Sequence, residues 1–135
     1  MRLLIDINVV LDVLLERTEW AEEAAHLLAA AERKAVTAFV AGHTITTAYY
    51  VVGRARDRKV AATALSDLLR ILEVVPVEKA DFSQALVLGF SDFEDAVQTA
   101  CAMKIGADYL VTRNEKDFKG APVPILPPGA VLALL

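Results

Sequence analysis

Acidic residues near both ends of the chain are those whose type and spacing could do chemistry. Asp6 directly follows a short apolar run, Asp92 and Asp95 open a stretch with apolar residues at helical spacing, and Asp117 follows the apolar run Tyr109–Thr112. Several carboxylates in one crevice repel one another unless some take a proton or a cation lies between them. Hard oxygen ligands without a Cys or His cluster select Mg²⁺ or Mn²⁺ over Zn²⁺. Because such ions activate water at phosphodiesters, the acids predict metal-dependent hydrolysis of a phosphate ester.

The elements that must position these acids alternate between strand and helix along the whole chain. Apolar runs predict strands at 2–5, 35–40, 73–77 and 109–112, with a fifth strand at the edge within 123–126. Helical periodicity predicts helices after Asp6, at 19–34, 45–54, 57–72 and 78–88, from Asp92 onward, and in a closing turn at 130–135. This alternation predicts an α/β fold, a three-layer α/β/α sandwich with a central, mostly parallel sheet of four to five strands. Ligands of such sheets bind beyond the carboxyl ends of the strands, where most of the acids are expected.

Length and composition indicate one compact domain spanning residues 1–135. Hydrophobic residues make up 56% of the chain, and the single cysteine, Cys101, permits no internal disulfide. Cys101 falls in an apolar helical stripe, which predicts a core thiol and is compatible with a cytoplasmic location. The apolar N-terminus is interrupted by Asp6 and Asp12, so we do not interpret it as a signal peptide. No run approaches the roughly 18 uninterrupted apolar residues of a membrane span.

Positive charge is concentrated in one short segment of an acidic chain. The formal net charge is −4, which excludes wholesale attraction to nucleic acid. Four basic residues nevertheless fall within six positions, and we call them the basic rim: Arg54, Arg56, Arg58 and Lys59. This segment is either a solvated helix end or an edge that binds nucleic acid or an acidic partner.

Several other polar and aromatic residues are expected to have structural roles. We expect Asp92 and Glu94 to cap or stabilise a helix start, and Trp20 to pack, with a self-association surface as the alternative. The remaining expectations are Asp12 on a helix surface, His43 as a donor in a strand-to-helix turn, Thr44 as a helix cap, and Tyr49 and Tyr50 in packing.

Two segments of the sequence resemble a known family. The N-terminal stretch LLIDINVVLDVLLER and the later stretch DFEDAVQTACAMKIGADYLVTRNEKDF are similar to the PIN-domain nucleases, in particular the VapC-like toxins of toxin–antitoxin pairs. The later stretch is the more specific of the two. The resemblance implies a Mg²⁺- or Mn²⁺-dependent ribonuclease that cuts RNA with a metal-activated water. It also implies inhibition by a cognate antitoxin protein of a VapBC-type pair, and a homodimer.

The resemblance assigns roles to individual residues. Asp6 matches the first metal-binding acid of the family, and Asn8 matches the polar residue that follows it. Asp95 matches the acid that opens the late helix, and Asp117 an acid in the polar turn after the fourth strand. Thr112 matches a small polar residue at the end of that strand. Catalysis and metal binding are therefore expected from Asp6, Asp95 and Asp117.

The sequence departs from the family pattern at two positions. The helix after the second strand usually carries a glutamate, but this chain has Thr47 or a neighbour there, which supplies no carboxylate. The turn after the fourth strand often carries an acid where this chain has Asn114, which leaves Asp117 and Asp92 to compensate. About three acids remain, which suffices for one tightly bound ion and leaves a second ion in doubt.

Two other interpretations compete with the nuclease. A strand followed by Asp-x-Asn is similar to the Asp-x-Asp start of haloacid-dehalogenase-like phosphatases, but Asn8 replaces the acid that would protonate the leaving group. The second alternative is a PIN-like domain whose missing acids have left a binding module for RNA or for a protein partner.

Overall fold

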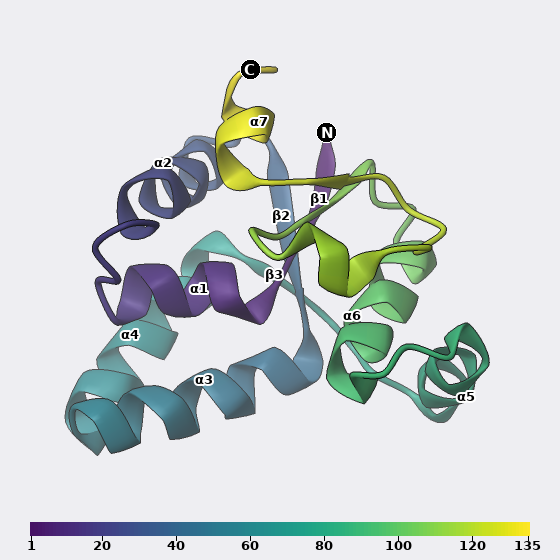
Figure 1. The fold of residues 1–135 in the computed structure, drawn as a ribbon. Coiled ribbons are helices and arrows are strands. Elements are labelled where there is room, and N and C mark those ends of the chain that lie inside the picture. Colours follow the sequence, from purple (N-terminus) through teal and green to yellow (C-terminus); the bar gives the residue numbers. More distant parts are fainter.

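The computed structural model describes all 135 residues and contains one five-stranded sheet (Figure 1). All four strand pairings are parallel, and the strand order is β3-β2-β1-β4-β5. The strands are β1 (Arg2–Ile5), β2 (Thr37–Ala41), β3 (Glu73–Val75), β4 (Tyr109–Val111) and β5 (Ile125–Leu126). The helices are α1 (Ile7–Leu14), α2 (Ala21–Glu32), α3 (Gly42–Ala55), α4 (Arg58–Ile71), α5 (Lys79–Leu88), α6 (Phe93–Lys104) and α7 (Pro128–Leu132), with a 3₁₀ helix η1 (Glu115–Phe118).

The sheet is covered by helices on both faces, so the predicted α/β/α sandwich is confirmed. Successive side chains of a strand point to opposite faces. In β1 this places Leu3 and Ile5 in a core with α1 to α4 and α7, whereas Leu4 packs with α5 and α6 on the other side. All three are fully buried, which is why the part of β1 between the exposed Arg2 and Asp6 carries no polar residue. Figure 1 shows the two helical layers on either side of the strands.

The strand order places a switch in chain direction beside β1. After β1 the chain adds β2 and then β3 on one side, and it later returns to add β4 and β5 on the other. Leu4 therefore pairs with Phe39 on one side and with Leu110 on the other. In parallel sheets the crevice beyond such a switch is where ligands bind, which here means the carboxyl ends of β1 and β4.

Helix α6 is fixed at both ends, which determines where its acidic first turn lies. At its start the carboxylate of Asp92 accepts a hydrogen bond from the backbone N–H of Asp95 at 3.2 Å, so the predicted cap is confirmed. At its end the Lys104 ammonium donates to the Pro76 carbonyl at 2.8 Å and to the Asp81 carboxylate at 2.9 Å. These contacts tie α6 to α5 and to the chain leaving β3.

The start of α3 differs from the prediction. The helix begins at Gly42 rather than at residue 45, so Thr44 lies inside its first turn and does not cap it. A Cβ atom at Gly42 would lie 3.1 Å from the carbonyl oxygen of Val75. The glycine therefore permits a close approach between α3 and the end of β3.

Tyr49 and Tyr50 are exposed on α3. Tyr50 is 62% exposed and Tyr49 is 40% exposed, so the expectation that both pack in the interior was wrong. The guanidinium of Arg54 lies over the Tyr50 ring, 5.7 Å from its centroid, on the solvent side of α3.

Cys101 is fully buried, as predicted. None of the helices combines the length and hydropathy needed to cross a bilayer.

Candidate active site

Asp6 lies buried at the junction of β1 and α1, where the switch in strand order predicts a site. Its side chain is held on both oxygens: the Thr112 hydroxyl donates to Oδ2 at 2.8 Å, and the Gln98 amide donates to Oδ1 at 3.0 Å. The residue is only 1% exposed, and this burial raises the pKa of Asp6 while the two side-chain hydrogen bonds oppose the shift. Asp6 and Thr112, which were both expected at strand ends, thus contact each other.

Gln98 connects α6 to this junction, and sequence reasoning did not identify it. The side chain is fully buried, and its amide oxygen accepts a hydrogen bond from the backbone N–H of Ile7 at 2.9 Å. Because that bond fixes the orientation of the amide, the Nε2 group faces Asp6 and also approaches Oδ1 of Asp95 at 3.5 Å, the outer limit of a hydrogen bond. One amide nitrogen therefore lies between the two carboxylates.

Asp95 lies in the first turn of α6, half-buried, and its charge is unfavourable in this structure. Burial raises the pKa of Asp95 to about 7, and negative charges on four neighbours act in the same direction: Asp92, Asp6, Asp117 and Glu94. Folding thus gathers carboxylates from β1, α6 and η1 around Asp95. A bound cation would relieve this repulsion directly.

The donors present suit a hard divalent cation held in part by water. No three carboxylate, imidazole or thiol groups are arranged as a ready-made metal site. Mg²⁺ commonly keeps several waters and takes one or two protein carboxylates, a need that Asp6 and Asp95 meet. Asp117 lies exposed on η1 and raises the pKa of Asp95, so it is near enough to act on that residue. Its role as a direct ligand stays a prediction.

The residues expected to support the site do not all lie beside Asp6. Asn8 lies in the first turn of α1, where its backbone N–H opposes the rise in the pKa of Asp6, and the backbone N–H of Asn114 donates to the Thr112 hydroxyl at 3.0 Å. Thr47 lies on α3, where it supplies no carboxylate. The basic rim lies at the far end of α3 and the start of α4, and a helix of 14 residues places it roughly 20 Å from the strand ends.

Asp12 was assigned to the helix surface, and this assignment was wrong. Its carboxylate is buried, where it accepts hydrogen bonds from Arg113 Nε at 2.8 Å and Nη2 at 3.3 Å, and from Arg17 Nη1 at 3.1 Å. The Arg113 guanidinium also stacks on Trp20, with its central carbon 3.8 Å from the ring centroid. Arg113 directly follows Thr112, so this ion pair lies beside the acids and lowers the pKa of Asp6.

His43 and Thr44 at the end of β2 also differ from expectation. Both ring nitrogens of His43 and the hydroxyl of Thr44 are buried without a hydrogen-bond partner, and they are the only such side-chain atoms in the molecule. His43 is therefore not the turn-stabilising donor that was expected. Burial lowers the pKa of His43, and the charge of Glu94 on α6 opposes this shift. The side chains thus form a polar region in the interior beside the strand that carries Asp6.

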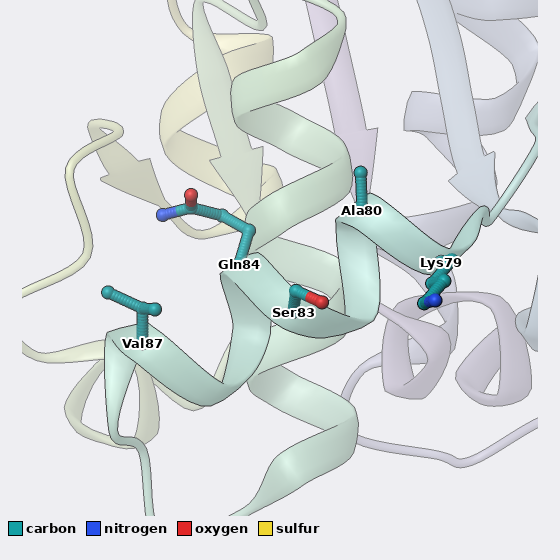
Figure 2. Close-up of a pocket in the computed structure, with 5 residues that line it drawn as sticks. All are labelled: Lys79, Ala80, Ser83, Gln84 and Val87. Atoms are coloured by element: carbon teal, nitrogen blue, oxygen red, sulfur yellow. The ribbon is translucent and has the colours of Figure 1, made fainter.

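A shallow depression on the outer face of α5 is separate from these acids. Figure 2 shows its lining residues along one side of the helix, among them Lys79, Ser83 and Gln84. No member of the group Asp6, Asp95 and Gln98 contributes to it. The candidate site is therefore the carboxylate group at the strand ends.

Comparison with known proteins agrees with the fold. The sequence matches the PIN domain family over residues 2–116. The chain belongs to the PIN-domain family. It is 30% identical over 133 residues to the Ribonuclease VapC1 of Aquifex aeolicus, an alignment that covers 93% of this chain and 89% of the relative.

Solved structures of VapC-containing proteins share the fold of this PIN domain. The VapBC2 complex of Rickettsia felis bound to a DNA fragment from its promoter matches with a TM-score of 0.75 at 16% identity, covering 94% of this chain and 98% of that one. The Mycobacterium tuberculosis VapC20, described as a sarcin-ricin loop cleaving toxin, matches with a TM-score of 0.66 at 17% identity, covering 80% and 86%. The family match supports a nuclease of the VapC type and favours it over the dehalogenase-like phosphatase.

Proposed function

We propose that this PIN domain is a Mg²⁺- or Mn²⁺-dependent ribonuclease that hydrolyses RNA phosphodiester bonds. The observation that carries the proposal is the pair Asp6 and Asp95, which meet across the Gln98 amide although 89 positions separate them in the sequence. Several carboxylates gather at the carboxyl edge of a parallel sheet, with the pKa of Asp95 raised to about 7, and a divalent cation would offset their repulsion. The family membership supports the same reaction class.

Each residue of the candidate site has a role in the proposed reaction. Asp6 and Asp95 would hold the ion, which when bound supplies an activated water and a Lewis acid for the phosphate. Thr112 and Gln98 orient the Asp6 carboxylate by donating to its two oxygens. Asp117 adds a negative charge at the rim and is proposed as the third acid.

Cleavage of a structured RNA tests this proposal. The wild-type chain is incubated with RNA in Mn²⁺ and in EDTA, beside Asp6→Asn and beside Asp67→Asn, a control at an exposed acid on α4. We expect cleavage in Mn²⁺ only, a loss of at least about 100-fold for Asp6→Asn, and no change for Asp67→Asn, because metal catalysis contributes several kcal/mol. Equal cleavage by Asp6→Asn, or none by the wild type, would refute the proposal.

A binding module without activity is the second candidate. It is favoured by Thr47, which leaves α3 without a carboxylate, and by the absence of a ready-made three-ligand site. The same RNA separates the two candidates when binding and cleavage are both measured. Retention of RNA that stays intact in Mn²⁺ would support the binding module.

We also propose that the chain is the toxin of a VapBC-type pair, inhibited by an antitoxin. The support is the family match and the fold shared with VapBC complexes. A mostly apolar groove between α1, α2 and α4, lined in part by Leu14, Ala29 and Ala64, is a suitable surface for such a partner. Substitution of Ala64 by Glu is expected to weaken inhibition by a co-expressed antitoxin without reducing cleavage of RNA by the free chain.

A homodimer is proposed on the family alone. Analytical ultracentrifugation at micromolar concentration tests it, and a monomer across that range would contradict it.

A further inference from the structure

A small hollow lies beside the acids, and its lining residues have no part in the proposed metal chemistry. It is lined by Asp12, Trp20, Glu23, Arg113, Pro127 and Pro128. Its volume is about 180 Å³, several times the roughly 30 Å³ that one water occupies, so it admits a flat ring. Its residues come from the ends of α1, β4 and β5 and from the start of α2, all at the carboxyl edge of the sheet.

The charge of Arg113 is already satisfied within the protein. Its Nε and Nη2 groups donate to the buried Asp12 carboxylate at 2.8 and 3.3 Å, and its guanidinium is stacked on the Trp20 ring. Arg113 is therefore held as a flat, oriented group and has little capacity left to bind a phosphate. Stacked planes of this kind bind nucleic-acid bases through their faces.

Trp20 and Glu23 give the hollow an aromatic wall and a hydrogen-bond acceptor. Trp20 is the only tryptophan of the chain, and its side chain is 40% exposed. It precedes α2 and lines the hollow. Glu23 is exposed and takes part in no salt bridge of the structure. Gly129 lets it approach, because a Cβ atom there would lie 2.8 Å from a Glu23 carboxylate oxygen. A carboxylate accepts hydrogen bonds only, so it favours a base edge with an amino group.

The position relative to the acids suits a neighbouring nucleotide. Arg113 directly follows Thr112, whose hydroxyl holds Asp6. The strands that carry Asp6 and Arg113 are adjacent, and β5 follows β4 at the edge. Asp12, which lines the hollow, lies on α1, the helix that begins directly after Asp6.

We propose that the hollow at Trp20, Glu23 and Arg113 is a base-binding subsite, which holds a base with an amino group (cytosine, adenine or guanine) next to the phosphate that is cut. This proposal rests on the ribonuclease function proposed above and adds a sequence preference to it. Uracil is disfavoured because it presents a carbonyl oxygen where cytosine presents an amino group, and that oxygen would face the Glu23 carboxylate.

Fluorescence of the single tryptophan tests the subsite without any cleavage. The wild-type chain in Mn²⁺ is titrated with cytidine, adenosine, guanosine and uridine 5′-monophosphates, and with ribose 5-phosphate as the probe without a base. We expect saturable quenching by the three nucleotides whose bases carry an amino group, binding of uridine monophosphate weaker by roughly fivefold or more, and no quenching by ribose 5-phosphate. Glu23→Gln should bring the four nucleotides within about twofold, and Glu22→Gln, its exposed neighbour, should retain the wild-type order.

Mapping of RNA cleavage sites separates this proposal from the proposed activity. We expect the wild type to cut beside cytosine, adenine or guanine rather than beside uracil, and Glu23→Gln or Trp20→Leu to cut with that preference lost. Wild-type cleavage of RNA with no base-dependent quenching, and an unchanged site pattern in both variants, would overturn the subsite alone. Absence of RNA cleavage by the wild type in Mn²⁺ would overturn the ribonuclease proposal, and with it the subsite.

Discussion

Replacement of Asp95 by Asn should make the metal-free chain more stable at alkaline pH. Because folding raises the pKa of Asp95 from 3.8 to about 7, the folded chain retains a proton that the unfolded chain releases. The resulting stability is complete below about pH 4 and is lost as the pH rises through about 7. Asparagine resembles the protonated acid at every pH, so the variant should not show this loss.

The size of the effect follows from the shift of the pKa. Three pKa units correspond to about 4 kcal/mol, but Asp95 is only half-buried, so screening by water and salt reduces the expected effect to about 1–2 kcal/mol. We therefore expect Asp95→Asn to match the wild type below about pH 4, to gain on it as the pH rises, and to exceed its free energy of unfolding by about 1–2 kcal/mol at pH 8.

Urea denaturation in EDTA at pH 4, 5, 6, 7 and 8 measures this difference. Asp67→Asn removes an exposed acid and serves as the control, which should follow the wild type at every pH. Millimolar Mn²⁺ should reverse the order at pH 8, because an ion at 100 times its Kd adds about 2.7 kcal/mol to the wild type alone. Parallel curves for the wild type and Asp95→Asn in EDTA would show that the carboxylates do not repel one another, which would refute the reasoning.

Three further predictions follow from particular contacts. Thr44→Val removes a buried hydroxyl that has no partner and should raise the free energy of unfolding by about 0.5–1 kcal/mol. Thr112→Val instead breaks a hydrogen bond to Asp6 and should lower the free energy of unfolding by about 1.5–3 kcal/mol. Urea denaturation measures both changes. Asp12→Asn weakens the buried ion pair with Arg113 and should cost about 2–3 kcal/mol in the same assay; a loss below 0.5 kcal/mol would contradict that role. If the basic rim binds RNA, alanine at its three arginines should flatten the dependence of log K on log salt by roughly 0.7 per lost contact, and an unchanged slope would exclude it.

The sequence predicted the fold well because local patterns determine most of it. Short apolar runs that end in a polar residue marked the strands, and the left-handed Gly89 at φ 69° ends α5 where predicted. Asp6 could be placed at a strand end because an acid after a fully apolar run has little other explanation. The convergence with Asp95 then followed from the rule that ligand sites lie beyond the carboxyl ends of parallel strands.

The residues that were missed depend on partners far away in the chain. Asp12 is polar at a helical position where a solvent-facing side chain is expected, and it is buried because Arg113, 101 positions later, neutralises it. Gln98 lies three positions after Asp95, which places both on one helix face, but its role depends on Asp6, 92 positions earlier. A periodicity argument contains no information about either contact. The single available signal was a lone amide in an otherwise apolar stretch of α6.

Calorimetric titration with Mn²⁺ tests most directly whether the carboxylates at the strand ends hold a cation. At pH 7 we expect the wild type to bind with a micromolar Kd and to release a proton, since Asp95 must ionise, so the heat should vary with the ionisation enthalpy of the buffer. Asp6→Asn should abolish this binding, and Asp67→Asn should retain it. No heat with the wild type, or the same affinity in Asp6→Asn, would contradict the site described above.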